Sequence, residues 1–348
     1  MINVDTIGVY GSLSGICDYW ELDPRRFVEH TTTRKEKRLE TPIISTSYEL
    51  KCDDIVGISS MWINEKEDLF KLEASSKVLQ EDYFKHLNIN TVDEFIAKIN
   101  KTLPGVVELN PYAFMEIGYL RRLDVLADID HTEAERQMLL RILHRSHEDG
   151  YNVKKWRTSR VFEKENASDN GDNSRLTTYG KFEELKAKNS ALNFQLFDPY
   201  THFLNTTRTE LNIKNKRNIR KYFKLDKKVK HIPVKVALLS DEKPLSRYMK
   251  GLIKPNIPPS LYETHNEKIA NCKTYAQRQN LIAAYTTLEE HNWSFKAVKE
   301  DAKKYWNPKH LSRELERLGY KKLIAEEKKL DVDESTLLEK YLVKLGAV

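Results

Sequence analysis

Tyr179, Lys181 and Glu184 are the residues whose types and spacing best suit chemistry, and all three fall in the segment SRLTTYGKFEELK. Side chains alternate along a predicted strand that ends at the tyrosine, and a helix is predicted to follow. A phenol has a pKa of about 10, so it is a nucleophile only beside a cation, a base or a metal-polarised electrophile. Lys181 is spaced to stabilise a phenolate or a phosphoryl oxygen. A tyrosine at a strand end is more often a packing residue, so a catalytic hypothesis needs further groups.

Carboxylates on other strand-like segments supply such groups. Asp124 lies in the middle of RRLDVLADID, where an apolar setting makes an unpaired charge costly. Asp128 follows four residues later, on the same face by strand alternation, and Glu210 lies in the strand-like TRTELNIK. If these strands are neighbours, these acids and Glu184 form an all-oxygen site suited to Mg²⁺ or Mn²⁺. Such an ion would polarise a phosphodiester for attack by Tyr179.

The simpler interpretation is that each carboxylate forms an ion pair with a nearby cation. The candidate pairs are Asp124 with Arg121 or Arg122, and Glu210 with Arg208 or Lys214. Only the joint placement of the acids on strands around one tyrosine favours a catalytic site.

Other catalytic patterns are missing from the sequence. None of the ten histidines forms the His-x-His pair by which many nicking enzymes bind metal. Neither a glycine-rich phosphate loop nor a G-x-S-x-G segment is present, which disfavours ATP-driven motor chemistry.

The composition is that of a soluble globular protein. It has 348 residues, of which 32% are charged, and this length allows two domains or one large domain with an appendage. No apolar run approaches the roughly 20 residues that cross a bilayer, and no secretory leader is visible. We therefore expect a cytoplasmic protein without membrane contact. Cys17, Cys52 and Cys272 lie far apart without metal-ligand spacing and are interpreted as reduced thiols.

Positive charge is concentrated in residues 214–230, KNKRNIRKYFKLDKKVK. This segment has a net charge of +8 against +6 for the whole chain, so the rest is near −2. Clustered cations favour a polyanion, because their binding releases counterions from nucleic acid; the alternative is a solvated helix face. The candidate DNA-binding residues are Arg175, Lys214, Lys216, Arg217, Arg220, Lys221, Lys227, Lys228, Lys309 and Arg313.

The order of predicted elements favours an α+β fold, an antiparallel sheet with packed helices, because hairpins and helices are mixed without regular βαβ units. Strands are predicted at 43–51, 55–63, 68–75, 115–129, 153–163, 174–180 and 207–214, and helices at 92–103, 132–150 and 181–189. We expect a first domain over residues 1–236 and a mainly helical domain over 237–348. The prolines from Pro244 to Pro259 predict a linker. Two short helices further on suit either a helix-turn-helix or an ordinary helical hairpin. No internal repeat is evident.

Five segments together resemble the gene II replication initiators of filamentous phages and, more distantly, the Rep_trans plasmid rolling-circle initiators. The resemblance runs from about residue 40 to residue 325. The segments are FKLEASSKVLQ, RRLDVLADID, SRLTTYGKFEEL, TRTELNIK and the stretch from YAQRQNLIAAYTTLEEH through HLSRELERLGYKK.

The resemblance implies that Tyr179 nicks one strand at the replication origin of a phage or plasmid and becomes linked to its 5′-phosphate. Lys181 and Glu184 complete the family's Y-x-K-x-x-E segment. Asp124 matches its strand aspartate, and Glu210 matches the glutamate of its R-F-E segment. Residues 1–236 would then be the nicking domain.

The family's reaction also implies partners. It is a metal-dependent transesterification that leaves a 3′-OH primer and later rejoins the displaced strand without ATP. Host helicase, host DNA polymerase and a homodimer are the expected partners, in the cytoplasm of a bacterial host. The basic segment and the C-terminal helices would hold origin DNA. Thr209 stands where the family usually has Phe, a modest departure beside Glu210.

Two other functions fit parts of the sequence. His310 and Arg313 match the H-x-x-R of tyrosine recombinases, with Tyr341 downstream, but those enzymes need no metal and form a 3′-phosphotyrosine. A non-catalytic DNA-binding regulator of a phage or plasmid would use the basic segment and leave DNA intact.

Overall fold

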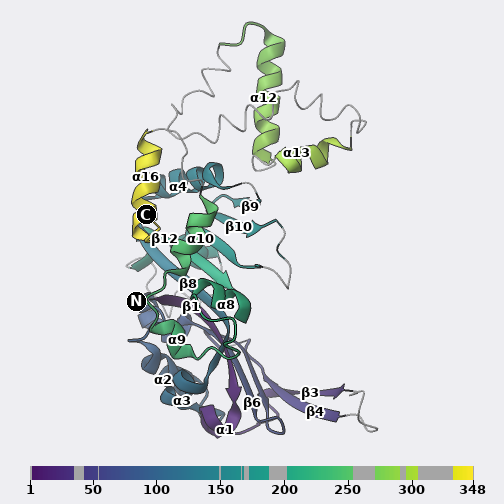
Figure 1. Cartoon of the computed structure of the whole chain (residues 1–348), viewed down its shortest axis with the longest axis vertical. Helices are drawn as coiled ribbons and strands as arrows, with labels where there is room; N and C mark the ends of the chain where they lie inside the picture. The colour runs from purple at the N-terminus through teal and green to yellow at the C-terminus, as the bar shows by residue number, and fades with distance from the viewer. Residues whose placement is uncertain are drawn as a thin grey trace.

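The chain forms an α+β fold built on one large antiparallel sheet (Figure 1). The computed structural model describes residues 2–34, 43–53, 55–148, 150–165, 167, 172–187, 202–253, 271–290, 295–304 and 332–347. Within these residues, ten strands make the large sheet and two short strands make a second one. The fold class is the one that the order of predicted elements indicates.

The strands of the large sheet are β1 (Asn3–Ser12), β3 (Phe27–Arg34), β4 (Ile43–Leu50), β5 (Ile58–Asn64), β6 (Leu69–Ser75), β8 (Tyr119–Asp130), β9 (Tyr151–Trp156), β10 (Ser159–Lys164), β11 (Arg175–Gly180) and β12 (Thr206–Ile213). The small sheet pairs β2 (Cys17–Trp20) with β7 (Val107–Leu109). The helices are α1 (Leu13–Ile16), η1 (Ser76–Lys85), α2 (Val92–Thr102), α3 (Pro111–Ile117), α4 (Glu133–Ser146), α5 (Lys181–Ala187), α8 (Lys216–Tyr222), α9 (Val234–Leu238), α10 (Pro244–Leu252), α12 (Tyr275–Glu290), α13 (Phe295–Ala302) and α16 (Val332–Lys344).

The strand order of the large sheet is a palindrome. It reads β3-β4-β5-β6-β1-β8-β12-β11-β10-β9. One half consists of β1 and the meander β3 to β6, and the other of β8 and the meander β9 to β12. In each half the first strand pairs with the last strand of the meander. β1 and β8 pair antiparallel at the centre. The sequence shows no internal repeat because the same strand pairing can be satisfied by different side chains. The hairpins β3–β4 and β9–β10 form the two edges of the sheet, and Figure 1 shows β9 and β10 well above β3 and β4.

Local sequence signals set where several elements begin. The predicted capping box starts α4: the Thr132 side chain accepts from the Glu135 N–H, and the Glu135 side chain accepts from the Thr132 N–H. α3 begins after Asn110, whose side chain accepts from the Ala113 N–H, with Pro111 at the first helical position.

Three sequence predictions were wrong in detail. The strand predicted from residue 115 begins only at Tyr119, because the capped helix α3 occupies the preceding residues. The single strand predicted over 153–163 is a hairpin, because a turn at Arg157 and Thr158 separates β9 from β10. Pro244 does not belong to a linker; it occupies the first turn of α10. The later prolines and the predicted helix after Pro308 lie outside the described residues.

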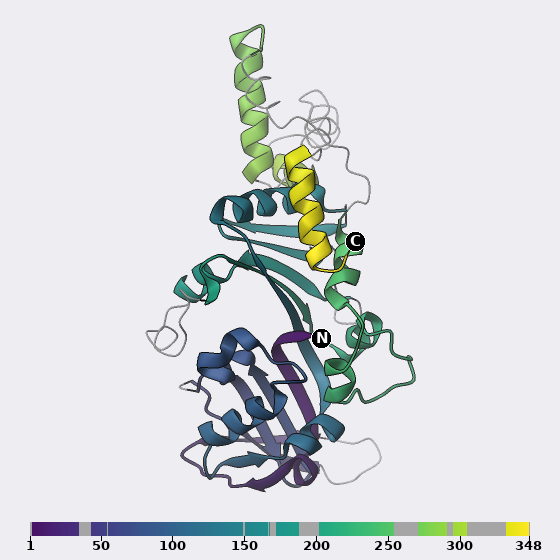
Figure 2. The ribbon, with the colours of Figure 1, turned by 90° about the vertical axis from the view of Figure 1, so that its left-hand side faces the viewer.

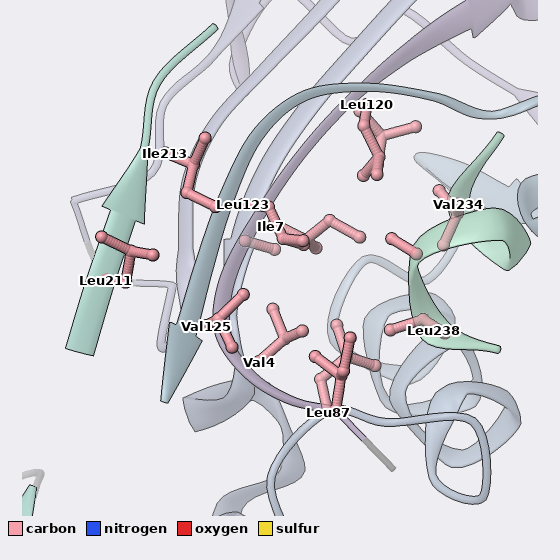
Figure 3. Close-up of a cluster of buried hydrophobic side chains, with 14 of the residues drawn as sticks. Val4, Ile7, Leu87, Leu120, Leu123, Val125, Leu211, Ile213, Val234 and Leu238 are labelled. Carbon is pink, nitrogen blue, oxygen red and sulfur yellow. The ribbon is translucent and has the colours of Figure 1, made fainter. Parts of the chain in front are cut away.

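The main core lies on one face of the central strands. On this face, alternate residues of the adjacent strands β8 and β12 are paired in register: Leu123 with Ile213 and Val125 with Leu211. Figure 3 shows these side chains gathered with Val4, Ile7, Leu87, Leu120, Val234 and Leu238. Because strand side chains alternate, the intervening residues of β8 and β12 project from the opposite face.

Elements beyond residue 237 also contribute to this core. α10 contacts β8 and β12, and α16 packs on α4, as Figure 2 shows for the latter pair. Tyr248 of α10 and Tyr341 of α16 are both buried in the core cluster. No described helix is long and apolar enough to span a membrane.

Candidate active site

The polar face of the sheet carries most of the residues singled out in the sequence. Strand register aligns Tyr179 of β11 with Arg208 of β12, and Arg208 with Asp128 of β8. Two residues further along β12, Glu210 pairs with Thr177 of β11. Directly opposed residues project from the same face, so these side chains share one surface although they come from three strands.

A pocket of about 580 Å³ opens on this surface. Five of the predicted site residues line it, from β8, β11, β12 and α5. They are Asp124, Arg175, Tyr179, Glu184 and Glu210. Asp5 of β1 joins them, and the β9–β10 hairpin closes one side with Trp156, Thr158 and Ser159.

The Tyr179 hydroxyl is directed at a carboxylate. It donates a hydrogen bond of 2.9 Å to Glu210 Oε2, and the residue is only 9% exposed. Burial and then the Glu210 charge raise the pKa of Tyr179 well above its usual value. Burial and then the Asp5 charge raise the pKa of Glu210 to about 7. The hydrogen bond places the Glu210 carboxylate where a general base for the phenol proton must stand.

Lys181 is the first residue of α5 and does not line the pocket. It is buried and donates a 2.8 Å hydrogen bond to Glu184 Oε2. Its Nζ stands 5.7 Å from the centre of the Tyr179 ring and 5.1 Å from that of Tyr83. Burial and then the Arg208 charge lower the pKa of Lys181. The predicted cation is thus beside the tyrosine ring, with Glu184 as its partner.

Gly180 separates the tyrosine from this lysine, and a side chain there would require Glu183 and Arg136 to move. A Cβ at Gly180 would lie 2.0 Å from Glu183 Oε2 and 2.9 Å from Arg136 Nε. Arg136 is buried and pairs with Glu183, which joins α4 to α5 at this point. The glycine therefore permits the close approach that holds the start of α5 against the end of β11.

Arg208 is fully buried and organises a network that the sequence did not predict. Its Nε and Nη2 each donate a 2.7 Å hydrogen bond to the Asp128 carboxylate. Its Nη1 donates to Asp5 Oδ1 at 2.9 Å and to the Tyr83 hydroxyl at 2.7 Å. His86 Nε2 lies 3.1 Å from Asp128 Oδ2. Asp128 is therefore on the predicted face but is held by Arg208 and His86, and it does not line the pocket.

Asp124 forms the ion pair that the simpler interpretation proposed. Arg122 donates to both of its oxygens, at 3.2 Å and 2.6 Å. Burial nevertheless raises the pKa of Asp124 to about 6, against the hydrogen bond and charge of Arg122. Glu210, by contrast, is bound by Tyr179 and not by the cations that the sequence offered as partners.

The donor chemistry of the pocket fits a divalent cation. Asp124 and Glu210 supply carboxylate oxygens from buried positions, and burial is the main cause that raises both pKa values. Among the described residues, no group of three or more Asp, Glu, His or Cys side chains stands close enough to hold one ion. Mg²⁺ commonly needs only one or two carboxylates, because water and substrate phosphate complete its shell.

The basic segment lies apart from the pocket. Its helix α8 packs against β8 and α10, with Ile219 and Tyr222 in the main core. Lys214, Arg217, Lys221, Lys227 and Lys228 are exposed, whereas Lys216 and Arg220 are half-buried. None of these residues lines the pocket, and Arg175 is the one candidate DNA-binding residue in the described part of the chain that does. Lys309 and Arg313 lie outside the described part of the chain.

Asp5, Tyr83 and Trp156 are site residues that the sequence reasoning missed. Asp5 had a visible signal, since it is a lone acid in the apolar β1 segment NVDTIGVY. Tyr83 and Trp156 carried no comparable pattern. Comparisons of the chain with protein-family models, with curated proteins and with solved structures found no match.

Proposed function

We propose that this protein is a rolling-circle replication initiator that nicks origin DNA of a phage or plasmid through Tyr179. The observation that supports this function best is the 2.9 Å hydrogen bond from the Tyr179 hydroxyl to Glu210, inside a pocket with further buried carboxylates. A phenol whose hydroxyl donates to a carboxylate has a base in place to take its proton during nucleophilic attack. The resemblance of the surrounding segments to gene II initiators supports the same reaction.

In the proposed reaction the Tyr179 oxygen attacks the scissile phosphorus while Glu210 accepts the phenol proton. The 3′ oxygen leaves, takes up a proton and becomes the primer end. The 5′-phosphate stays on the tyrosine, so the bond energy is kept for a later rejoining. Lys181 stands beside the ring, where its charge stabilises a phenolate. Host polymerase and helicase would extend and unwind from the nick.

Asp124 and Glu210 would hold the divalent ion, Mg²⁺ or Mn²⁺, with water and a substrate phosphate completing its shell. When bound, the ion would withdraw charge from the phosphodiester and make it a better electrophile. The protein's own contribution is to keep these carboxylates buried beside the nucleophile.

The experiment that tests the function incubates purified protein with its own supercoiled replicon, with and without Mg²⁺. We expect relaxed circles and a covalent protein–DNA adduct only with the metal, and the adduct should map to Tyr179 and the 5′ side. Binding without a nick under any divalent metal would instead support the non-catalytic regulator. A 3′ linkage would support a recombinase, although the buried Tyr341 hydroxyl is already hydrogen-bonded to Thr178 and Thr209.

Mg²⁺ should also stabilise the protein in the absence of DNA. At ten times its dissociation constant, a ligand of the folded state adds about 1.4 kcal/mol, which for a chain of this size raises the melting temperature by roughly 2 °C. Asp124→Asn should remove this rise, measured by thermal shift against EDTA. Glu339→Gln, an exposed acid on α16, is the matched control and should keep it. Equal shifts in Asp124→Asn and wild type would mean that the ion binds elsewhere.

A further inference from the structure

The β9–β10 hairpin carries basic and aromatic side chains beside the Tyr179 pocket. Its sequence from residue 153 to 160, VKKWRTSR, has four Lys or Arg residues and one Trp. β9 is an edge strand whose alternate residues are exposed. Cations interleaved with an aromatic side chain on an open strand are typical of surfaces that bind single-stranded nucleic acid.

Strand register places Trp156 in the same row as the candidate nucleophile. Trp156 pairs with Ser159 on β10, and Ser159 pairs with Tyr179 on β11. Their side chains therefore project from one face, and both line the pocket. Neighbouring strands lie about 4.8 Å apart, so the two backbones are separated by about 10 Å. A strand whose phosphate reaches Tyr179 would pass within reach of the indole.

The Trp156 ring is available to a ligand. Trp156 is 51% exposed, and within the described residues its indole has no hydrogen bond and no ring contact. The two other tryptophans that the structure describes differ in this respect, because Trp20 donates to Glu65 and Trp62 contacts His30. Stacking on a planar base would remove this apolar surface from water.

Cations flank the indole where a phosphate chain would run. Arg175 lines the same pocket with a side chain that is 40% exposed, and its buried Nε has no hydrogen-bond partner among the described atoms. Lys154 projects from the same face as Trp156, two residues before it. Its Nζ is 3.1 Å from Glu163, and its side chain is largely exposed.

A buried guanidinium fixes the hairpin before any ligand arrives. Arg160 is 4% exposed, and its Nη1 donates to the backbone oxygens of Trp156, at 2.6 Å, and Ser159, at 2.8 Å. The turn that carries the indole is thereby held in place, so binding does not have to order it first.

We propose that Trp156 is a stacking platform for one unpaired nucleobase next to the scissile phosphate. The inference rests on the proposed function, because it names the form of the substrate: a single strand, not a duplex. Bases in a duplex already stack on their neighbours, whereas an unpaired base offers a free face. Every base has such a face, so the contact holds the strand without selecting its sequence.

The test compares two probes on a Tyr179→Phe background, which prevents cleavage: a labelled oligothymidylate and an abasic oligonucleotide of equal length. Trp156→Ala should weaken oligothymidylate binding about 5- to 150-fold and leave abasic binding nearly unchanged, measured by fluorescence anisotropy. Trp156→Phe should recover most of the loss. Tyr112→Ala is the matched control, because Tyr112 is 76% exposed and does not line the pocket.

An equal loss on both probes would overturn the proposal, because the indole would then act through the fold or the charges of the hairpin. Full oligothymidylate binding by Trp156→Ala would overturn it as well. Nicking of the replicon is assayed separately with wild type. A wild type that nicks while Trp156→Ala binds normally refutes the platform alone, whereas a wild type that forms no adduct refutes the proposed function.

Discussion

Tyr179→Phe is expected to abolish the protein–DNA adduct and to reduce nicking by at least about 10³-fold. Phenylalanine keeps the ring in its pocket but lacks the hydroxyl that donates to Glu210, so no group remains to attack phosphorus. Binding of DNA should persist, because the exposed cations and the hairpin are unchanged. The measurement is conversion of supercoiled to relaxed circles with Mg²⁺, together with detection of labelled DNA that remains on the denatured protein.

Tyr341→Phe is the control that separates this site from the recombinase alternative. Tyr341 is buried on α16, and its hydroxyl is hydrogen-bonded to Thr178 and Thr209. Its loss should cost about 1 kcal/mol of stability and leave nicking intact. Equal nicking by wild type and Tyr179→Phe would remove Tyr179 as the nucleophile, and loss of adduct in Tyr341→Phe alone would transfer that role.

The sequence predicted the parts of the site that depend on local periodicity. Alternation along a strand correctly placed Asp124 and Asp128 on one face, because side-chain direction in a strand depends only on residue parity. The Lys181 to Glu184 contact is likewise local, since residues three apart on a helix are neighbours. The position of Tyr179 at a strand end needed no long-range information either.

Contacts between distant segments could not be predicted in the same way. Arg208 meets Asp5 only because β1 is inserted between β6 and β8, a choice that the palindromic topology makes and no local pattern records. Charge alone also could not decide between the partners of Glu210. The structure pairs it with Tyr179 because register sets β11 beside β12.

The position of the basic segment relative to the pocket could not be predicted from composition. Its composition correctly marked a run of exposed cations, but composition carries no information about which face of a sheet a helix covers. α8 buries Ile219 against the main core, so its exposed lysines stand away from the pocket. Among the described residues, the cations that line the pocket are instead Arg122 of β8 and Arg175 of β11, and Lys181 lies beside the Tyr179 ring.

Arg208→Met should be the most destabilising single substitution in the site. It removes a fully buried guanidinium and leaves the carboxylates of Asp5 and Asp128 without their main partner, a loss that typically costs 3–5 kcal/mol, so we expect about 4 kcal/mol at pH 7. Urea unfolding measures the effect. Lys214→Met, which removes an exposed cation at the end of the same strand, is the control and should change stability by less than about 0.5 kcal/mol.

The destabilisation by Arg208→Met should depend on pH, and the pKa of Asp5 sets the direction of that dependence. Burial works to raise the pKa of Asp5, but the charges of Lys181 and Arg208 outweigh it and lower the value from 3.8 to about 2. Because the pKa of Asp5 is lower in the folded state than in the unfolded state, its carboxylate stabilises the fold at pH values above the unfolded-state pKa. This stabilisation is lost as the pH falls through the folded-state pKa. In Arg208→Met the carboxylates should protonate readily, so the unpaired charge disappears. The difference between wild type and variant should therefore shrink as pH falls from 7 toward about 2, the folded-state pKa of Asp5 in the wild type. A difference that stays constant over that range would mean that Arg208 acts through packing and not through its charge.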